Sequence, residues 1–163
     1  MKRVAVIGLI SYLAFALEFL LYNFWGQWGK PELLILVVIF FNLYLGIRFS
    51  IIAAVFAGVF KDASGAAPFG TYILVYIAAA YITTFVRRYL YQQGSRFSRA
   101  MVAFFVVAGC FVVQAVLSNM DHEIHLPELL LYLLVPQLLT TMVAATYVFA
   151  QLKNISVFFA LKT

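Results

Sequence analysis

Residues 53–70 read AAVFAGVFKDASGAAPFG and interrupt a chain that is otherwise a series of long apolar segments. Lys61 and Asp62 directly follow an apolar run of ten residues (51–60), and glycine and proline follow them. A ten-residue helix extends roughly 15 Å, about half of a bilayer's hydrocarbon core. We therefore expect a short third helix over about residues 50–62. A break should follow it, enclosed by other helices because irregular backbone in a membrane needs polar partners.

The composition predicts an all-α integral membrane protein. Of the 163 residues, 66% are hydrophobic and 10% are charged, whereas soluble domains contain about 25% charged residues. The gaps between apolar segments are short, so we expect one polytopic membrane domain over residues 1–163. The single cysteine, Cys110, excludes an intrachain disulfide. The net charge of +5 is better explained by basic residues at one membrane face than by nucleic-acid binding.

Six apolar segments predict a bundle of six transmembrane helices, at about residues 4–22, 31–47, 50–62, 70–86, 101–117 and 128–152. Basic residues concentrate on the cytoplasmic side of membrane proteins. An arrangement with both termini in the cytoplasm places nine of the eleven basic residues on that side: Lys2, Arg3, Arg48, Arg87, Arg88, Arg96, Arg99, Lys153 and Lys162. The opposite orientation would reverse this distribution, so we expect both termini to be cytoplasmic.

The sequence contains no motif of an intramembrane protease: neither H-E-x-x-H nor G-x-S-x-G occurs. Ser64, His122 and Asp62 or Asp121 offer a conceivable nucleophile set on the outer side, but serine beside glycine is typical of a turn. His122 and His125, in an acidic loop, offer ligand types that a metal accepts, although such a loop is more often simply solvated. We therefore expect no catalytic, cofactor or metal site.

Asp62 is the residue for which a functional role is most plausible, because ionisable residues near the end of a membrane helix are costly without a partner. One hypothesis is that its carboxylate caps the break by accepting amide hydrogen bonds from Ser64 or Gly65. The alternative is a contact with another partner: Lys61, Lys30 or backbone amides after the Ser64-Gly65 break. Glu18, at a similar height on the first helix, is expected to reach to the membrane interface.

Residues 31–70 resemble the rod-shape-determining protein MreD family. The second helix opens with Pro31-Glu32, where proline is tolerated and the acid faces the positive end of the helix dipole. The Gly58-x-x-x-Asp62 step carries much of the resemblance. The other positions that carry it, and that we take as candidates for structural or interaction roles, are Ser64, Gly65, Pro68 and Gly70.

This resemblance implies a non-enzymatic subunit of the bacterial elongation machinery, located as a multi-pass protein in the plasma membrane. The implied partners are an MreC-type membrane protein and, directly or through it, MreB, RodA and the transpeptidase that acts with RodA in lateral peptidoglycan synthesis. MreD-like proteins are also similar in architecture to the substrate-binding subunits of energy-coupling-factor vitamin transporters, which is the alternative function. Anionic lipids are expected at Arg87, Arg88, Arg96 and Arg99.

Overall fold

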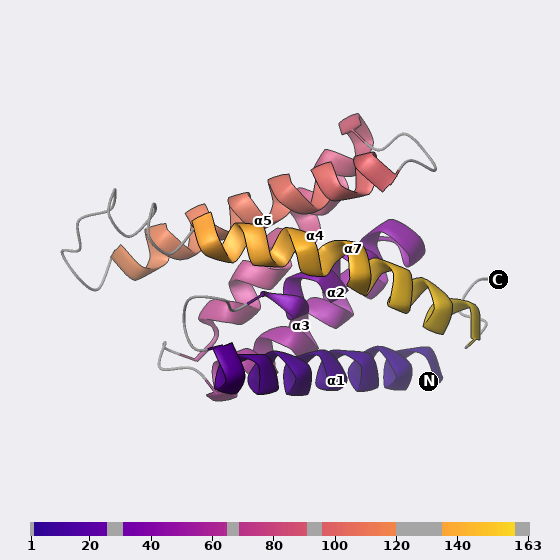
Figure 1. The fold of residues 1–163 in the computed structure, drawn as a ribbon, viewed down its shortest axis with the longest axis horizontal. Helices are drawn as coiled ribbons and strands as arrows, with labels where there is room; N and C mark the ends of the chain where they lie inside the picture. The colour runs from indigo at the N-terminus through magenta and orange to yellow at the C-terminus, as the bar shows by residue number, and fades with distance from the viewer. Residues whose placement is uncertain (1, 26–30, 65–68, 91–95, 120–134, 159–163) are drawn as a thin grey trace.

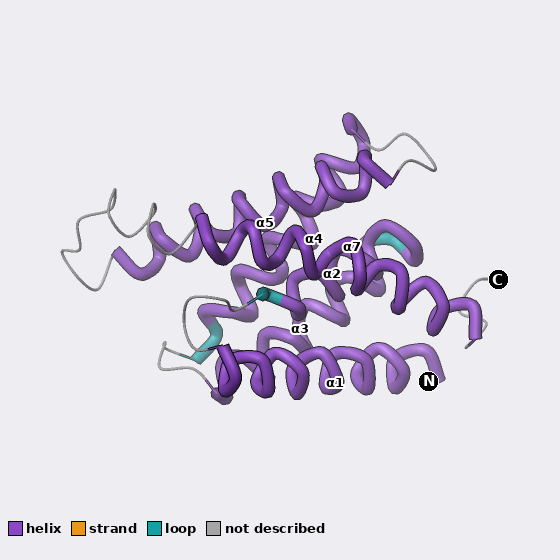
Figure 2. The backbone as a smooth tube through the Cα atoms, in the orientation of Figure 1, coloured by secondary structure: helices purple, strands orange, loops and turns teal. Residues whose placement is uncertain are grey.

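The computed structural model describes residues 2–25, 31–64, 69–90, 96–119 and 135–158 (Figure 1). In these ranges the chain forms helices and contains no strand (Figure 2). The helices are α1 (Lys2–Trp25), α2 (Leu33–Leu45), α3 (Ile47–Ser64), α4 (Thr71–Leu90), α5 (Arg96–Asn119) and α7 (Val135–Phe158). The prediction of an all-α protein is confirmed for the described residues.

Helix α2 lies at the centre of the bundle. Every side chain from Leu33 to Leu43 is buried, and the helix contacts α1, α3, α4, α5 and α7. In Figure 1, α7 passes across α2, and α1 runs along one edge of the bundle. A helix that is apolar on all sides is stable only where neighbours surround it, which explains why this 13-residue segment forms the core.

A single residue, Gly46, joins α2 to α3. Its φ of 91° lies in the left-handed region, which glycine adopts without a steric penalty. Its amide donates to the carbonyls of Phe41 and Asn42 at 3.1 Å each, which satisfies the end of α2. The chain therefore reverses direction here without a loop.

The third helix is longer than the expected residues 50–62. Helix α3 is continuous over 18 residues, or roughly 27 Å at 1.5 Å per residue. The polar residues in its first turns are accommodated: the Ser50 hydroxyl donates to the Val38 carbonyl at 2.9 Å, and Arg48 is exposed. The expected break falls partly on residues 65–68, which lie outside the described residues.

Among the described residues, one stretch is long and apolar enough to cross a membrane by length and composition, Val4–Phe24 of α1. The apolar stretches of α2, α5 and α7 are shorter: Leu33–Leu45, Met101–Val113 and Leu138–Leu152. The helices occur where apolar segments were expected. Their number as membrane spans, their orientation and the extent of the membrane domain stay predictions.

Candidate functional site: a buried charged cluster

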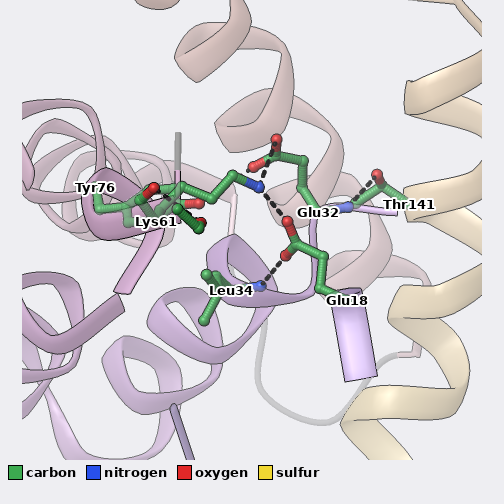
Figure 3. A network of polar contacts seen from close by, with 7 residues as sticks. Glu18, Glu32, Leu34, Lys61, Tyr76 and Thr141 are labelled. Carbon is green, nitrogen blue, oxygen red and sulfur yellow. Dashed lines mark hydrogen bonds and ion pairs between the residues drawn. The ribbon is translucent and has the colours of Figure 1, made fainter. Parts of the chain in front are cut away.

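Three charged side chains meet inside the bundle, and we call Glu18, Glu32 and Lys61 the charged cluster (Figure 3). The Lys61 ammonium donates to Glu18 Oε1 and lies 3.6 Å from Glu32 Oε1. The side chains of Lys61, Glu18 and Glu32 are only 7%, 3% and 6% exposed. Three elements supply them, namely α1, the residue before α2, and α3, so the cluster joins segments that are distant in sequence.

Hydrogen bonds extend the cluster to further helices. The second Glu18 oxygen, Oε2, accepts the Leu34 amide at 3.4 Å, and Glu32 Oε2 accepts the Tyr76 hydroxyl of α4 at 3.3 Å. The Glu32 amide donates to Thr141 Oγ1 of α7 at 3.2 Å. Figure 3 shows these groups converging at the start of α2. The site therefore connects α1, α2, α3, α4 and α7.

The arrangement explains how charges are tolerated in an apolar interior. Burying an isolated charge is very unfavourable, and a buried ion pair is tolerated when further hydrogen bonds satisfy its remaining donors and acceptors. Glu18 meets this condition with the Lys61 ammonium on one oxygen and the Leu34 amide on the other. The charged side chains bind one another and the backbone of a neighbouring helix, an arrangement suited to holding helices together.

Asp62 follows Lys61 in sequence but does not bind the groups that Lys61 binds. Its carboxylate accepts three backbone amides at the start of α4: Gly70 and Tyr72 at 3.0 Å each, and Ile73 at 3.3 Å. The first amides of a helix lack internal partners, and an acidic side chain there also faces the positive end of the dipole. Asp62 is thus a cap, as one of the two hypotheses stated. The three amides follow the Ser64-Gly65 break and lie at the start of α4, which is the backbone partner that the alternative named. Gly65 itself lies outside the described residues.

Three other candidate residues of this region, Ser64, Gly58 and Gly70, lie in the described part of the chain. The Ser64 hydroxyl donates to the Lys61 carbonyl at 3.1 Å. Gly58 is buried, and a Cβ atom built on it would lie 2.5 Å from Ile73 Cα, so α3 and α4 touch backbone to backbone here. Gly70 has a φ of 104°, a conformation that favours glycine. Gly65 and Pro68 lie outside the described residues.

At the start of α2, Pro31 and Glu32 were expected to open the helix, with the Glu32 side chain facing the positive end of the helix dipole. The Glu32 side chain is directed elsewhere. Pro31 is buried, and its carbonyl accepts the Leu33 amide at 3.0 Å. Glu32 occupies the N-cap position, but its side chain makes no capping hydrogen bond and instead faces Lys61 and Tyr76. The Glu32 carboxylate therefore contributes to the charged cluster and not to a side-chain cap of α2.

Glu18 is the residue that sequence reasoning placed wrongly. It was expected to reach the membrane interface, yet it is 2% exposed and pairs with Lys61. The signal for this role was present, because an acid inside the apolar segment 4–22 needs a partner and Lys61 is a lysine at comparable depth. Tyr76 carried no such signal, because a lone hydroxyl in an apolar segment has many alternative partners.

A second polar site lies at the opposite end of α2. The Asn42 amide donates to the Ala80 carbonyl at 2.8 Å and to Thr84 Oγ1 at 2.9 Å. A guanidinium nitrogen of Arg87 donates to the Asn42 carbonyl at 2.8 Å. Arg87 therefore binds the end of α2, whereas Arg88 is exposed. The side chains of Arg96 and Arg99, the other expected lipid contacts, are outside the described part.

The structure also bears on the catalytic and metal alternatives. Asp62 and Ser64 are engaged with separate backbone groups, while His122, His125 and Asp121 lie outside the described residues. Within the described ranges, no group of three or more His, Cys, Asp or Glu residues is arranged to hold a metal ion.

A comparison with protein families gives one result for almost the whole chain. The family model described as "rod shape-determining protein MreD" matches residues 2–155. No curated protein and no solved structure matches the chain. The match includes both the charged cluster and the polar site around Asn42.

Proposed function

Because the chain belongs to the MreD family of rod shape-determining proteins, we propose that it is a non-catalytic, multi-pass subunit of the elongation complex in the bacterial plasma membrane. In this role it supports lateral peptidoglycan synthesis by binding an MreC-type membrane protein. Through that contact, or beside it, the chain associates with MreB, RodA and the transpeptidase that acts with RodA.

The closed charged cluster is the observation that best supports a structural role. Its charged groups bind one another and the backbone of neighbouring helices, and their side chains are at most 7% exposed. A subunit that binds or converts a small molecule needs polar groups directed into an accessible cavity. Here the polar groups of the cluster are used to connect helices, which fits a rigid partner for other membrane proteins.

A proposed orientation follows from the two ends of the bundle. The Lys2 end of α1, the Phe158 end of α7 and the last turn of α4 lie toward the same side of the bundle (Figure 1). Arg87, in that last turn of α4, contacts Asn42 near the end of α2. The charged cluster and Asp62 lie toward the other end. If the arginine end is cytoplasmic, as the distribution of basic residues favours, both termini are cytoplasmic and the exposed Arg88 can contact anionic lipids.

The proposed function is tested by complementation in a rod-shaped bacterium that depends on this protein. Depletion is expected to turn rods into spheres, and the wild-type chain should restore them. Gly58→Leu should fail, because its side chain would meet the backbone of Ile73 and separate α3 from α4. Val112→Leu is the matched control, because Val112 is 54% exposed and a larger side chain there meets no tight packing.

Purification from membranes with identification of bound proteins provides the second readout. We expect wall-synthesis subunits to be recovered with the wild-type chain. Rod shape that survives complete loss of the protein, together with a defect in vitamin uptake, would refute the proposal and support the transporter subunit instead.

A further inference from the structure

Two tyrosines near the start of α4 contact the charged cluster. Tyr72 and Tyr76 are four residues apart, so they lie on the same side of the helix, and their ring centroids are 6.3 Å apart. The Tyr76 hydroxyl donates to Glu32. The Lys61 ammonium lies over the Tyr72 ring, with Nζ 5.7 Å from the ring centroid. Helix α4 therefore reaches both the acidic and the basic part of the cluster.

The contact between Lys61 and the Tyr72 ring is favourable, because the face of an aromatic ring carries partial negative charge. A cation within about 6 Å of the ring centroid is attracted to it, and more strongly where water is excluded. The Lys61 side chain is only 7% exposed. The ring thus adds a neighbour on a further helix to the two acids that face the ammonium, Glu18 and Glu32.

The backbone of the same tyrosine is bound by Asp62. Asp62 Oδ1 accepts the Tyr72 amide at 3.0 Å, while Oδ2 accepts the amides of Gly70 and Ile73. Tyr72 is the second residue of α4, where amides have no partner inside the helix and the helix end readily frays. The Asp62 cap therefore fixes the place from which the Tyr72 ring reaches Lys61.

We propose that Tyr72 is a positioning residue that couples the Asp62 cap to the charged cluster. Asp62 and Lys61 bind different groups, the amide and the ring, but both groups belong to Tyr72. A change at the cap should therefore reach Lys61 and, through its bond to Glu18, helix α1. The inference concerns the folded chain and does not depend on the proposed role in the elongation complex.

A double-mutant cycle measures this coupling. Asp62→Leu weakens the cap, Glu18→Gln weakens the cluster, and chemical unfolding of the full chain in detergent micelles gives an unfolding constant for each variant. For independent sites, the factors by which the two changes raise this constant multiply. We expect the double variant to deviate from the product by at least about twofold. A value equal to the product would overturn the proposal. If Asp62→Leu does not fold, Asp62→Asn takes its place in the cycle.

Variants of Tyr72 show whether the coupling passes through its ring. Tyr72→Phe keeps the ring and the amide, so it should retain the deviation. Tyr72→Leu keeps the amide but loses the ring, so it should abolish the deviation. Tyr81→Leu is the matched control on the same helix, because Tyr81 is 57% exposed, and it should leave the coupling unchanged. Coupling that survives Tyr72→Leu would refute the proposal, since Lys61 and Asp62 would then interact through α3 alone.

Hydrogen exchange in the folded chain provides a readout of local opening. Glu18→Gln changes a residue of α1, yet it should speed exchange of the Tyr72 amide at least about twofold, because the ring is less firmly held and the first turn of α4 opens more often. The same change in a Tyr72→Leu background should have no such effect at position 72. Amides in the middle of α4 serve as the internal control. Equal acceleration in both backgrounds, or none in either, would overturn the proposal.

Discussion

At the scale of single residues, the buried charged side chains in the described part of the chain have different structural roles. Lys61 neutralises acids from two other elements, whereas its neighbour Asp62 satisfies the first amides of α4. Adjacent helical residues point in directions about 100° apart, so neighbours in sequence face different groups. This explains why Lys61 and Asp62, although oppositely charged and adjacent, hold different pairs of helices together.

Loss of the central cation should be strongly destabilising. Lys61→Met leaves Glu18 and Glu32 facing each other without their ammonium, and removing one partner of a buried ion pair costs about 3–5 kcal/mol. We expect a lower thermal unfolding midpoint in detergent and lower abundance in membranes.

The matched control neutralises the acids as well. Lys61→Met combined with Glu18→Gln and Glu32→Gln removes the uncompensated charge and should recover much of the lost stability. The electrostatic explanation would be wrong if the triple variant were less stable than Lys61→Met alone.

Two substitutions of Asp62 distinguish its role as a hydrogen-bond acceptor for the α4 amides from a role of its negative charge. Asp62→Asn retains an acceptor oxygen and should lower stability only slightly. Asp62→Leu leaves amides of Gly70, Tyr72 and Ile73 without their acceptor, at a cost of about 1–3 kcal/mol. Thermal unfolding measures both variants, and identical, wild-type-like curves would show that the cap does not contribute.

At the scale of elements, the tightest contact is between α3 and α4. Ala53, Ala54, Ala57 and Gly58 of α3 are all buried, and such small residues let helix backbones approach each other. The Asp62 cap fixes the start of α4 at the same contact. Close packing and capping therefore act together, because the cap sets the position at which Ile73 meets Gly58.

Even one added methyl group should disturb this contact. Gly58→Ala places a Cβ atom 2.5 Å from Ile73 Cα, and backbone atoms cannot move aside as a flexible side chain can. We expect a destabilisation of about 1–3 kcal/mol, measured by thermal unfolding.

Gly8→Ala is the matched control on another helix. Its Cβ atom would lie 3.7 Å from the Phe56 ring, an ordinary contact, and alanine favours the helical conformation. Gly8→Ala should therefore be neutral or stabilising. If both alanine variants behaved alike, close approach of α3 and α4 would not be important.

At the scale of the whole molecule, α2 is bound by polar groups at both ends and surrounded by apolar side chains between them. The Glu32 amide bonds to Thr141 at one end, and Arg87 binds the Asn42 carbonyl at the other. Lipid supplies no hydrophobic attraction between helices, so membrane bundles depend on packing and on such contacts. The two ends also differ in charge, which is the basis of the proposed orientation.

Labelling of introduced cysteines tests that orientation. In intact cells, cysteines at Lys2 and Gln92 should resist an impermeant thiol reagent, because both positions are expected in the cytoplasm. A cysteine at His122 should react from outside. Permeabilised cells provide the control, in which all three should react. Labelling of Gln92 in intact cells would exclude the proposed topology.

The sequence by itself determined that the protein is helical and where the apolar segments lie, because apolarity and segment length are local properties of the chain. It also indicated that Asp62 is a cap, since a carboxylate before a turn needs nearby amides. Family membership was indicated by a short segment, Pro31 to Gly70, and the family model extends it to residues 2–155.

Only the tertiary structure decided which groups meet. Lys61 pairs with Glu18 across 43 positions, and Tyr76 bonds to Glu32 across 44; nothing local in the sequence selects these partners among several polar residues at similar depth. The contact between the Ser50 hydroxyl and the Val38 carbonyl of α2 is likewise visible only in the tertiary structure. Local chemistry sets the elements, whereas the pairing of buried polar groups depends on which helices become neighbours.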